Sequence, residues 1–258
     1  MMTGCISLVP SNRNDMKTLL AVLFLCAQSF GANHYVTPTG TSGNTGVDSL
    51  HAWSLTYAFD GAASISAGDT VWIESGTYSY SGTCAKTGTS SLPIVYRNHA
   101  NEIVTVYGTG TSSTFTLSGS YIWLWGMEIY NVDTAVTTHE GYDIETANCT
   151  GCKFINCIIH DALTNGIFER QASVGTEVYG CTFYYCGRKQ SNTKYGYGIY
   201  SQNAAGNAPR WYVNNIFINN YGNDPIHCYG SAGGTDSMFI IRNFLTGMLD
   251  RSCIEVGC

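Results

Sequence analysis

The sequence is poor in charge, and above all in positive charge. Lysine and arginine together number 12 among 258 residues, aspartate and glutamate number 18, and the net charge is −6. Charged residues make up 12% of the chain, against about 25% in a typical soluble domain. A protein that binds a phosphate backbone needs clustered Lys and Arg, so the composition excludes nucleic acid as the expected partner.

Long apolar runs are also missing. The run Leu19–Ala27 has nine residues, whereas a membrane-spanning helix needs about 20, and we expect no membrane span elsewhere. Lys17 precedes this run and the small residue Ser29 follows it, in the order that is typical of a secretory signal peptide. We therefore predict a signal peptide in residues 1–31, including an upstream extension in 1–15, and a secreted protein, extracellular or periplasmic. An uncleaved membrane anchor is the alternative.

Proline is rare, with five residues, whereas glycine and tyrosine number 29 and 18, which indicates strands and tight turns. Of the 11 cysteines, Cys5 and Cys26 lie in the predicted signal peptide, so nine remain without it. Secretion permits disulfides, but an odd number leaves at least one thiol free or bonded to another chain. The Cys149 and Cys152 pair is a weak zinc signal, because a structural zinc site needs four ligands.

The second half of the sequence is a repeat. Five segments align without gaps, at offsets of 30, 24, 34 and 28 residues: Leu124–Asn131, Phe154–Asp161, Val178–Tyr185, Tyr212–Asn219 and Ile240–Gly247. Two columns of this alignment are apolar in every copy, and they read Trp125, Ile155, Tyr179, Val213, Ile241 and Ile129, Ile159, Phe183, Phe217, Leu245. Between them lies a turn column that reads Met127, Cys157, Cys181, Asn215, Asn243.

A second strand follows each copy, centred on Ile144, Ile167, Ile199, Ile226 and Ile254, with inserted loops at Val132–Tyr142 and Tyr184–Tyr197. Short strands that stack at a variable period of about 30 residues predict an all-β fold, a parallel β-helix, whose coils lie about 4.8 Å apart. A helical solenoid would show a 3.6-residue period, and a sandwich would place Asn-Gly or Asp-Gly turns between strands. Asparagines in the turn column would bond from coil to coil. Cys157 and Cys181 would lie within disulfide reach, and both a disulfide and a buried stack of thiols stay open.

The front of the chain carries a family resemblance. HYVTPTGTSGNTG starts at His34, and WSLTYAFDGAASISAGDTVWIESGTYS starts at Trp53, where Gly68, Asp69, Gly76 and Tyr78 fit the phrase GDTV-x-I-x-x-GTY. These stretches resemble the opening of secreted right-handed parallel β-helix proteins of the pectate lyase-like superfamily, in the manner of chondroitinase B and alginate lyases. GYGIYSQNAAGN and NNIFINNYGNDPIHCYGSAGG look like uncharacterised bacterial members. The resemblance implies a short capping helix at residues 55–63 and a right-handed β-helix domain over 32–258. It does not fix the reaction, because this fold carries several.

The chain stops at Cys258, directly after the fifth Ile-centred strand. No polar capping segment follows, although solenoids need capped ends. We therefore expect a β-helix that lacks later coils at its C-terminus.

Residues that follow the inward isoleucines point outward, because side chains alternate along a strand. This outward column reads Glu145, Phe168, Tyr200, His227, Glu255, and Arg170, Gln202 and Tyr229 lie at the strand ends beside it. Arg188, Lys189 and Lys194 lie in the inserted loop before Tyr200. Aromatic rings cover the apolar faces of sugars and polar side chains fix the hydroxyls, so this face is our candidate for binding a polysaccharide. An ordinary solvated face is the alternative.

Cleavage of an acidic glycan by a lyase needs three functions. The sugar carboxylate is neutralised by Ca²⁺ or by Arg and Lys, a base takes the C5 proton, and an acid assists the leaving oxygen. Arg170, Tyr200 and His227 fall on consecutive coils and are the catalytic candidates. The substrate-binding candidates are Glu145, Phe168, Lys189, Lys194, Gln202 and Tyr229. No cofactor is certain, and Ca²⁺ stays open.

Carboxylates offer a weaker alternative. A glycosidase needs two carboxyl groups about 5 to 9 Å apart, but Glu145 and Glu169 lie on adjacent coils in columns one residue apart, so one of them would face inward. Asp143 and Glu145 share one side of a strand and could bind Ca²⁺ through oxygen. His160 and Asp161 lack a nucleophile at a suitable spacing, which favours a turn histidine bonded to backbone. The sequence thus predicts a secreted β-helix with lyase-like action on an acidic glycan, or alternatively a non-catalytic glycan-binding or surface-structural solenoid.

Overall fold

The computed structural model describes residues 31–61, 64–110, 112–132, 141–187, 196–221, 224–230, 235–247 and 254–257, and the backbone alone for the last of these ranges. The signal peptide predicted in residues 1–31 lies outside these ranges except for Gly31. In the described part, no helix is long and apolar enough to cross a membrane.

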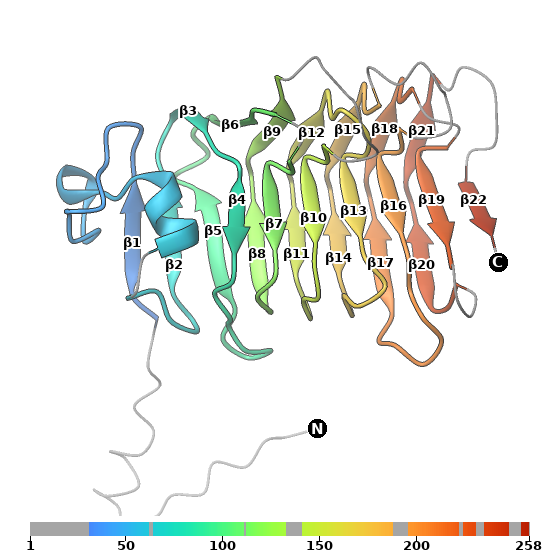
Figure 1. Cartoon of the computed structure of the whole chain (residues 1–258), viewed down its shortest axis with the longest axis horizontal. Helices are drawn as coiled ribbons and strands as arrows, with labels where there is room; N and C mark the ends of the chain where they lie inside the picture. The colour runs from blue at the N-terminus through green and yellow to red at the C-terminus, as the bar shows by residue number, and fades with distance from the viewer. Residues whose placement is uncertain are drawn as a thin grey trace, which may run out of the picture. The chain divides into compact units, whose positions relative to one another are not determined.

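The described strands form three sheets, and the chain visits the sheets in turn (Figure 1). Sheet A consists of β1 (Asn33–Val36), β2 (Thr70–Ile73), β5 (Ile94–Asn98), β8 (Ile122–Trp125), β11 (Lys153–Ile155), β14 (Glu177–Tyr179), β17 (Arg210–Val213) and β20 (Met238–Ile241). Sheet B consists of β3 (Gly76–Ser79), β6 (Val104–Gly108), β9 (Glu128–Asn131), β12 (Ile158–His160), β15 (Thr182–Tyr184), β18 (Ile216–Ile218) and β21 (Phe244–Thr246). Sheet C consists of β4 (Gly82–Cys84), β7 (Phe115–Leu117), β10 (Ile144–Thr146), β13 (Ile167–Glu169), β16 (Ile199–Ser201), β19 (Ile226–Tyr229) and β22 (Ile254–Gly257).

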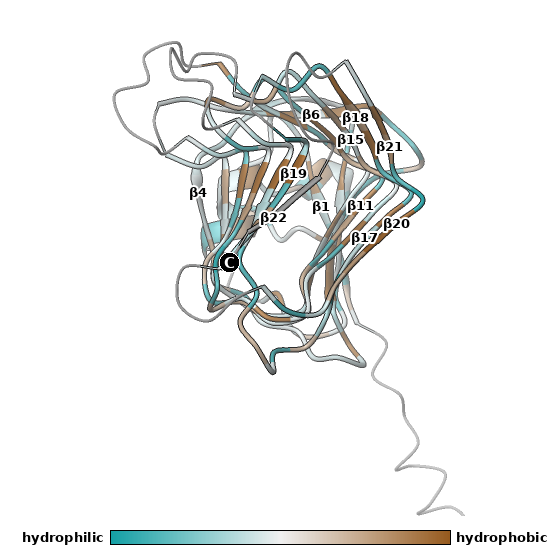
Figure 2. Cartoon of the chain, turned by 90° about the vertical axis from the view of Figure 1, so that its right-hand side faces the viewer, coloured by the Kyte–Doolittle hydropathy of each residue, from teal (hydrophilic) through white to brown (hydrophobic). Residues whose placement is uncertain are grey.

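Every strand pair in the three sheets is parallel, for example β12 with β15 and β13 with β16. Parallel strands that recur in every third position of the chain make a β-helix, and the predicted fold is confirmed. The three sheets form the walls of the solenoid when it is viewed along its axis (Figure 2). Side chains that point inward from all three walls fill its interior.

The predicted core column of sheet B is correct. Ile129, Ile159, Phe183, Phe217 and Leu245 pair in one continuous register across five strands. Phe183 and Phe217 lie in the core, and their rings stack at 4.7 Å with an interplanar angle of 6°. The Ile-centred column of sheet C is also correct, since Ile144, Ile167, Ile199 and Ile226 pair in register and are fully buried.

The other apolar column faces outward. Trp125, Ile155 and Tyr179 pair in register on sheet A but stay partly exposed. The inward residues of this sheet stand one position earlier, at Leu124, Phe154, Val178 and Tyr212. An apolar column was therefore not sufficient evidence of burial, because the outer surface of sheet A is itself apolar.

In five successive coils, two residues connect the strand of sheet A to the strand of sheet B, and the first of the two turns the chain. This residue has a positive φ in five successive coils, at Gly126, Asn156, Gly180, Asn214 and Arg242. Glycine and asparagine adopt this left-handed conformation at the least cost, which explains four of the five residues.

The asparagines of the turn column next to this corner bond from coil to coil, as predicted, and the column is buried as far as Asn215. The Asn215 side chain accepts a hydrogen bond from the Cys181 amide at 2.8 Å and donates to the Asn243 side chain at 3.0 Å. Cys157 and Cys181 are buried, unbonded thiols, so the stack without a disulfide is the arrangement found. The Cys157 amide donates to the Cys181 sulfur at 3.4 Å.

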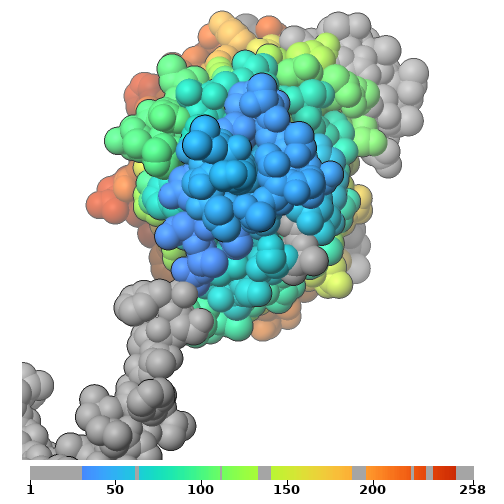
Figure 3. Space-filling model, turned by 90° about the vertical axis from the view of Figure 1, so that its left-hand side faces the viewer, coloured from blue at the N-terminus to red at the C-terminus, as the bar shows by residue number. Residues whose placement is uncertain are grey.

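A short helix stands close to the predicted cap, as the π-helix η2 (Tyr57–Gly61), after the 3-10 turn η1 (Ser49–His51). Phe59 of η2 is fully buried and stacks on Tyr96 at 4.1 Å. The first described residues lie across this end of the solenoid in Figure 3, where they are blue. Asp69 ties them to the first coil, since its carboxylate accepts hydrogen bonds from the amides of Ala32 and Ser66 at 2.6 and 2.8 Å.

Candidate functional site

The predicted outward column of sheet C exists and is in register. Glu145, Phe168, Tyr200 and His227 are direct neighbours on β10, β13, β16 and β19. The alternation that buries Ile144, Ile167, Ile199 and Ile226 turns these side chains outward. The column continues to Glu255 in the backbone of β22. We call the outer surface formed by Glu145, Phe168, Arg170, Tyr200 and His227 the sheet C surface.

Aromatic rings form a continuous strip along this surface. The ring centroids of Phe168 and Tyr200 lie 5.2 Å apart, and those of Tyr200 and His227 also lie 5.2 Å apart. Residues from the preceding turns extend the strip: Tyr142 lies 4.6 Å from Phe168, and Tyr197 stacks on His227 at 4.4 Å. The strip therefore spans the coils that carry all three catalytic candidates.

Stacking within this strip limits what the rings can do for a sugar. The interplanar angles of His227 with Tyr197 and Tyr200 are 12° and 23°, so these rings cover one another's faces. A stacked ring presents its edge to a ligand. Phe168 is more tilted, at 45° to Tyr200, but the Arg170 guanidinium lies over one of its faces. Recognition here depends on polar edges more than the sequence suggested.

Arg170 lies beside the strip and is already paired. Its Nε donates to Glu145 in a short ion pair, and its guanidinium lies 5.0 Å above the Phe168 ring. Ser113 donates to the other oxygen of Glu145 at 3.2 Å. The Arg170 side chain remains half exposed, whereas that of Glu145 is 13% exposed. The pair therefore presents the arginine, rather than the glutamate, to a ligand.

The remaining predicted residues divide into three groups. His227 Nδ1 lies 3.4 Å from the Asp224 carboxylate, a partner that was not predicted from the sequence. Gln202 donates to the Tyr200 hydroxyl at 3.4 Å, and Tyr229 is exposed at the edge of the strip, 6.1 Å from the ring of His227. Arg188, Lys189 and Lys194 lie outside the described residues.

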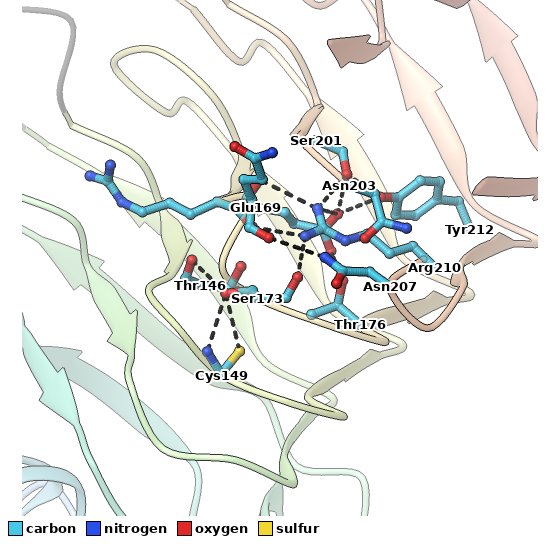
Figure 4. A network of polar contacts seen from close by, with 12 residues as sticks. Thr146, Cys149, Glu169, Ser173, Thr176, Ser201, Asn203, Asn207, Arg210 and Tyr212 are labelled. Carbon is cyan, nitrogen blue, oxygen red and sulfur yellow. Dashed lines mark hydrogen bonds and ion pairs between the residues drawn. The ribbon is translucent and has the colours of Figure 1, made fainter. Parts of the chain in front are cut away.

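A buried polar network lies directly beneath this surface (Figure 4). Glu169 and Arg210 have no exposed side-chain surface and form an ion pair at 3.3 Å. Thr176 and Ser201 also donate to the Glu169 carboxylate, at 2.6 and 2.8 Å, and the Tyr212 hydroxyl makes a further short contact with it. Burial and the Glu169 charge raise the pKa of Tyr212 well above its usual value.

This network holds the backbone that carries Arg170. Arg210 donates through Nη2 to the carbonyl of Arg170 at 2.8 Å and to that of Ser173. Arg210 was not predicted from the sequence, although its position contained a signal. It stands two residues before the inward Tyr212, as Glu169 stands two residues after the inward Ile167, so both charges fall on the inward side of their strands.

Glu145 and Glu169 do not form a glycosidase pair, because one faces outward and the other is fully buried. Within the described residues, no group of three or more His, Cys, Asp or Glu side chains is arranged to hold a metal ion. Of the two carboxylates predicted as a Ca²⁺ pair, Asp143 is fully buried, whereas Glu145 bonds to Arg170 and Ser113. In the part of the chain that the structure describes, the sheet C surface thus lacks the outward pair of carboxylates that the Ca²⁺ prediction needed.

His160 lies on sheet B and makes side-chain contacts, where the sequence favoured a bond to backbone. Its Nδ1 lies 2.8 Å from Asp161 and its Nε2 lies 3.2 Å from Glu128. Its ring is stacked between Tyr130 and Tyr184, at 5.0 and 4.4 Å. It takes no part in the sheet C surface.

No protein-family model and no curated protein matches the sequence. Among solved structures, the fold is similar to that of a pectate lyase, with a TM-score of 0.56, 18% identity, and coverage of 77% of this chain and 48% of that chain. It is similar to a rhamnogalacturonan lyase, with a TM-score of 0.62, 17% identity, and coverage of 88% and 62%. It is also similar to an alginate lyase from a Paenibacillus species, with a TM-score of 0.55, 17% identity, and coverage of 76% and 74%.

The chain thus spans about half to three quarters of the length of these structures. At such identities the likeness shows the fold alone, a β-helix shared with proteins that act on glycans. The reaction has to be argued from the site.

Proposed function

We propose that the protein is secreted and cleaves an acidic polysaccharide by β-elimination on the sheet C surface. The observation that carries this proposal is that Tyr200 and His227 are neighbours on adjacent coils and that Arg170 lies over Phe168, on the coil before Tyr200. An arginine, a phenol and an imidazole are the kinds of group that this reaction needs. The fold supports the substrate class, because the solved structures similar to this chain include lyases of pectate, rhamnogalacturonan and alginate by name.

The elimination step assigns a role to each residue. A base removes the proton at C5 of the uronic acid, the C5–H electrons form a C4–C5 double bond, and the C4–O bond breaks towards the departing sugar. His227 is the proposed base: donation from Nδ1 to Asp224, 3.4 Å away, favours the tautomer in which Nε2 is the basic nitrogen. The Tyr200 hydroxyl, 5.2 Å away between ring centroids, is the proposed acid that protonates the leaving oxygen.

Arg170 neutralises the sugar carboxylate in this mechanism. Neutralisation matters because the negative charge that develops at C5 during proton removal is delocalised into that carboxylate. The ion pair with Glu145 uses Nε of Arg170, which leaves its two Nη atoms as the pair that meets a carboxylate with parallel hydrogen bonds. Glu145 and Phe168 hold the guanidinium in place, and this reduces the entropy lost on binding.

A non-catalytic glycan-binding surface is the second candidate function. It is favoured by the ion pair that Arg170 already makes and by the stacking of Tyr197, Tyr200 and His227 on one another. These contacts stabilise a fixed, edge-on polar strip that suits recognition as well as chemistry. The two functions differ in one product, the unsaturated sugar, which only the elimination forms.

The test is a substrate screen of the purified protein. Alginate, polygalacturonate, chondroitin and heparin are incubated with it, with and without Ca²⁺, and ultraviolet absorbance follows the conjugated double bond of the product. We expect absorbance to rise with at least one of these polymers. Binding without any rise in absorbance would favour the non-catalytic function and would contradict the proposed lyase.

Two substitutions test the residue roles. His227→Ala should lower turnover at least 100-fold, within the range that general acid–base groups contribute. Arg170→Ala should also lower it at least 100-fold, as the loss of one group that stabilises developing charge does. Thr116→Ala is the control, because Thr116 is the outward residue of β7 on the same sheet and has no proposed role in binding or proton transfer. If both variants keep the parent's turnover at an unchanged melting temperature, the sheet C surface is not the active site.

A further inference from the structure

The outer surface of sheet A gathers aromatic residues with basic ones. Four of the five tryptophans lie on it, and its outward positions include Trp72, Trp123, Trp125, Tyr179, Trp211 and Phe239. In Figure 2, β11, β17 and β20 form one wall of the solenoid, and no other described element lies outside it. No role was predicted for this surface from the sequence.

Arg97 lies at the N-terminal half of this surface, between two indole rings. Its guanidinium carbon is 4.9 Å from the ring of Trp72 and 4.3 Å from that of Trp125. The two tryptophans are its direct neighbours on β2 and β8. A planar guanidinium between two aromatic faces is held in one orientation, so its remaining donors have a fixed direction.

Arg97 has no anion of its own among the described residues. Its Nε is buried without a hydrogen-bond partner. Arg170 and Arg210, in contrast, each pair with a glutamate. The outward residues of β2, β5, β8 and β11 include no carboxylate: they are Thr70, Trp72, Val95, Arg97, Trp123, Trp125, Lys153 and Ile155.

Lys153, two coils further along, is also a cation between aromatic rings, and it has a carboxylate partner. Its Nζ lies 4.9 Å from the Trp123 ring and 5.9 Å from the Tyr179 ring. It also meets the Glu177 carboxylate at 2.6 Å. A cation that stacks on aromatic rings of this surface can therefore still bind a carboxylate. Arg97 has no such carboxylate from the described protein, so a ligand would have to supply it.

We propose that Arg97, with Trp72 and Trp125, forms a second glycan site that binds the carboxylate of an acidic polysaccharide without cleaving it. The acidic glycan as ligand rests on the substrate class proposed above. A second copy of the chain fits less well as the ligand. A two-fold contact through this surface would bring the cations of the two copies together, and each copy also carries a net charge of −6. The site would hold the polymer to the solenoid while the sheet C surface acts on another part of it.

The experiment measures binding separately from turnover. Affinity electrophoresis through gels that contain polygalacturonate, alginate or neutral dextran is run in the Arg170→Ala background, so that the sheet C surface contributes little. Arg97→Gln removes the charge, and Arg97→Lys keeps the charge but loses the planar donors. Arg242→Asn is the control, since Arg242 is exposed on a corner of positive φ, which asparagine tolerates, and the change removes the same charge.

We expect an acidic polymer, but not dextran, to retard the protein. Arg97→Gln should weaken this binding at least tenfold, Arg97→Lys should fall between, and Arg242→Asn should bind like its background. Oligogalacturonate should also change the tryptophan fluorescence of the Arg97 protein but not that of Arg97→Gln, because Trp72 and Trp125 contact the guanidinium.

Three results would overturn the proposal. They are unchanged binding by Arg97→Gln, an equal loss in Arg242→Asn, which would mean that only net charge matters, and no binding of either acidic polymer by the Arg170→Ala protein. A dimer in sedimentation that Arg97→Gln dissociates would show that a second copy covers this surface. Failure of the lyase assay would leave these outcomes intact, because none of them depends on product.

Discussion

At the scale of single residues, the most consequential contact is the ion pair of Glu169 and Arg210. Both side chains are completely buried, and removal of water from two charges is costly unless each is fully compensated. Here Thr176, Ser201 and Tyr212 complete the shell of Glu169. The network thus keeps two charges inside the solenoid and fixes the backbone of Arg170 above it.

Removal of one partner of the ion pair should lower the free energy of unfolding. We predict that Arg210→Met lowers the free energy of unfolding by about 3 to 5 kcal/mol, because it leaves the Glu169 charge buried and unpaired. The double variant Glu169→Gln with Arg210→Met should lose clearly less than the sum of the two single variants. Urea denaturation measures all three, and strictly additive losses would mean that the two residues do not stabilise each other.

Because thiols are buried, the free energy of unfolding should depend on pH in the alkaline range. Burial, with the nearby Glu169 charge, raises the pKa of Cys228 from 9.0 to about 12. Between these values the unfolded chain loses this proton and the folded chain keeps it, so the free energy of unfolding falls as pH rises above about 9, and the contribution is lost by about 12. Cys228→Ala should flatten this slope, measured by urea denaturation from pH 8 to 11. An unchanged slope would contradict the assignment.

At the scale of strands, the alternation of inward and outward residues sets both the core and the site. Phe217 is 1% exposed and stacks on Phe183, whereas Tyr200 is outward on sheet C. Phe217→Ala should cost about 3 to 5 kcal/mol of unfolding free energy, as large-to-small changes in packed cores do. Tyr200→Ala should cost much less. Equal losses on denaturant unfolding would mean that the register is wrong by one residue, because a single step exchanges the two faces of a strand.

The inward columns of sheets B and C could be read from the sequence, because each is apolar in every coil, although sheet B also exposes Ile158, Ile216 and Phe244. Ile159 and Ile199, for example, stand next to His160 and Tyr200. The outer surface of sheet A is apolar too, so the sequence did not indicate whether Trp125 and Ile155 face inward or outward. The pair of Glu169 and Arg210 joins residues 41 positions apart, and no local pattern identifies such a contact. The stacking of Tyr197 on His227 likewise depends on the path of a loop.

At the scale of the whole molecule, the solenoid is a stack in which each coil contacts its neighbours. Stability in such a protein is close to a sum of coil and interface contributions. The short helix η2 is the contact at one end of this stack. Phe59 packs on Tyr96 and Phe115, and the Tyr96 hydroxyl donates to the Ala58 carbonyl at 3.2 Å.

A cavity at this end should therefore destabilise only the neighbouring coils. We predict that Phe59→Ala, which removes a fully buried ring, increases amide hydrogen exchange in β2, β5 and β7 and leaves β15 and β18 protected, because no direct contact carries the loss across the intervening coils. Phe217→Ala is the matched control, with its increase centred on β15 and β18. An equal loss of protection in all coils after Phe59→Ala would mean that the solenoid unfolds as one cooperative unit, and that the end contact supports the distant sheet C surface as well.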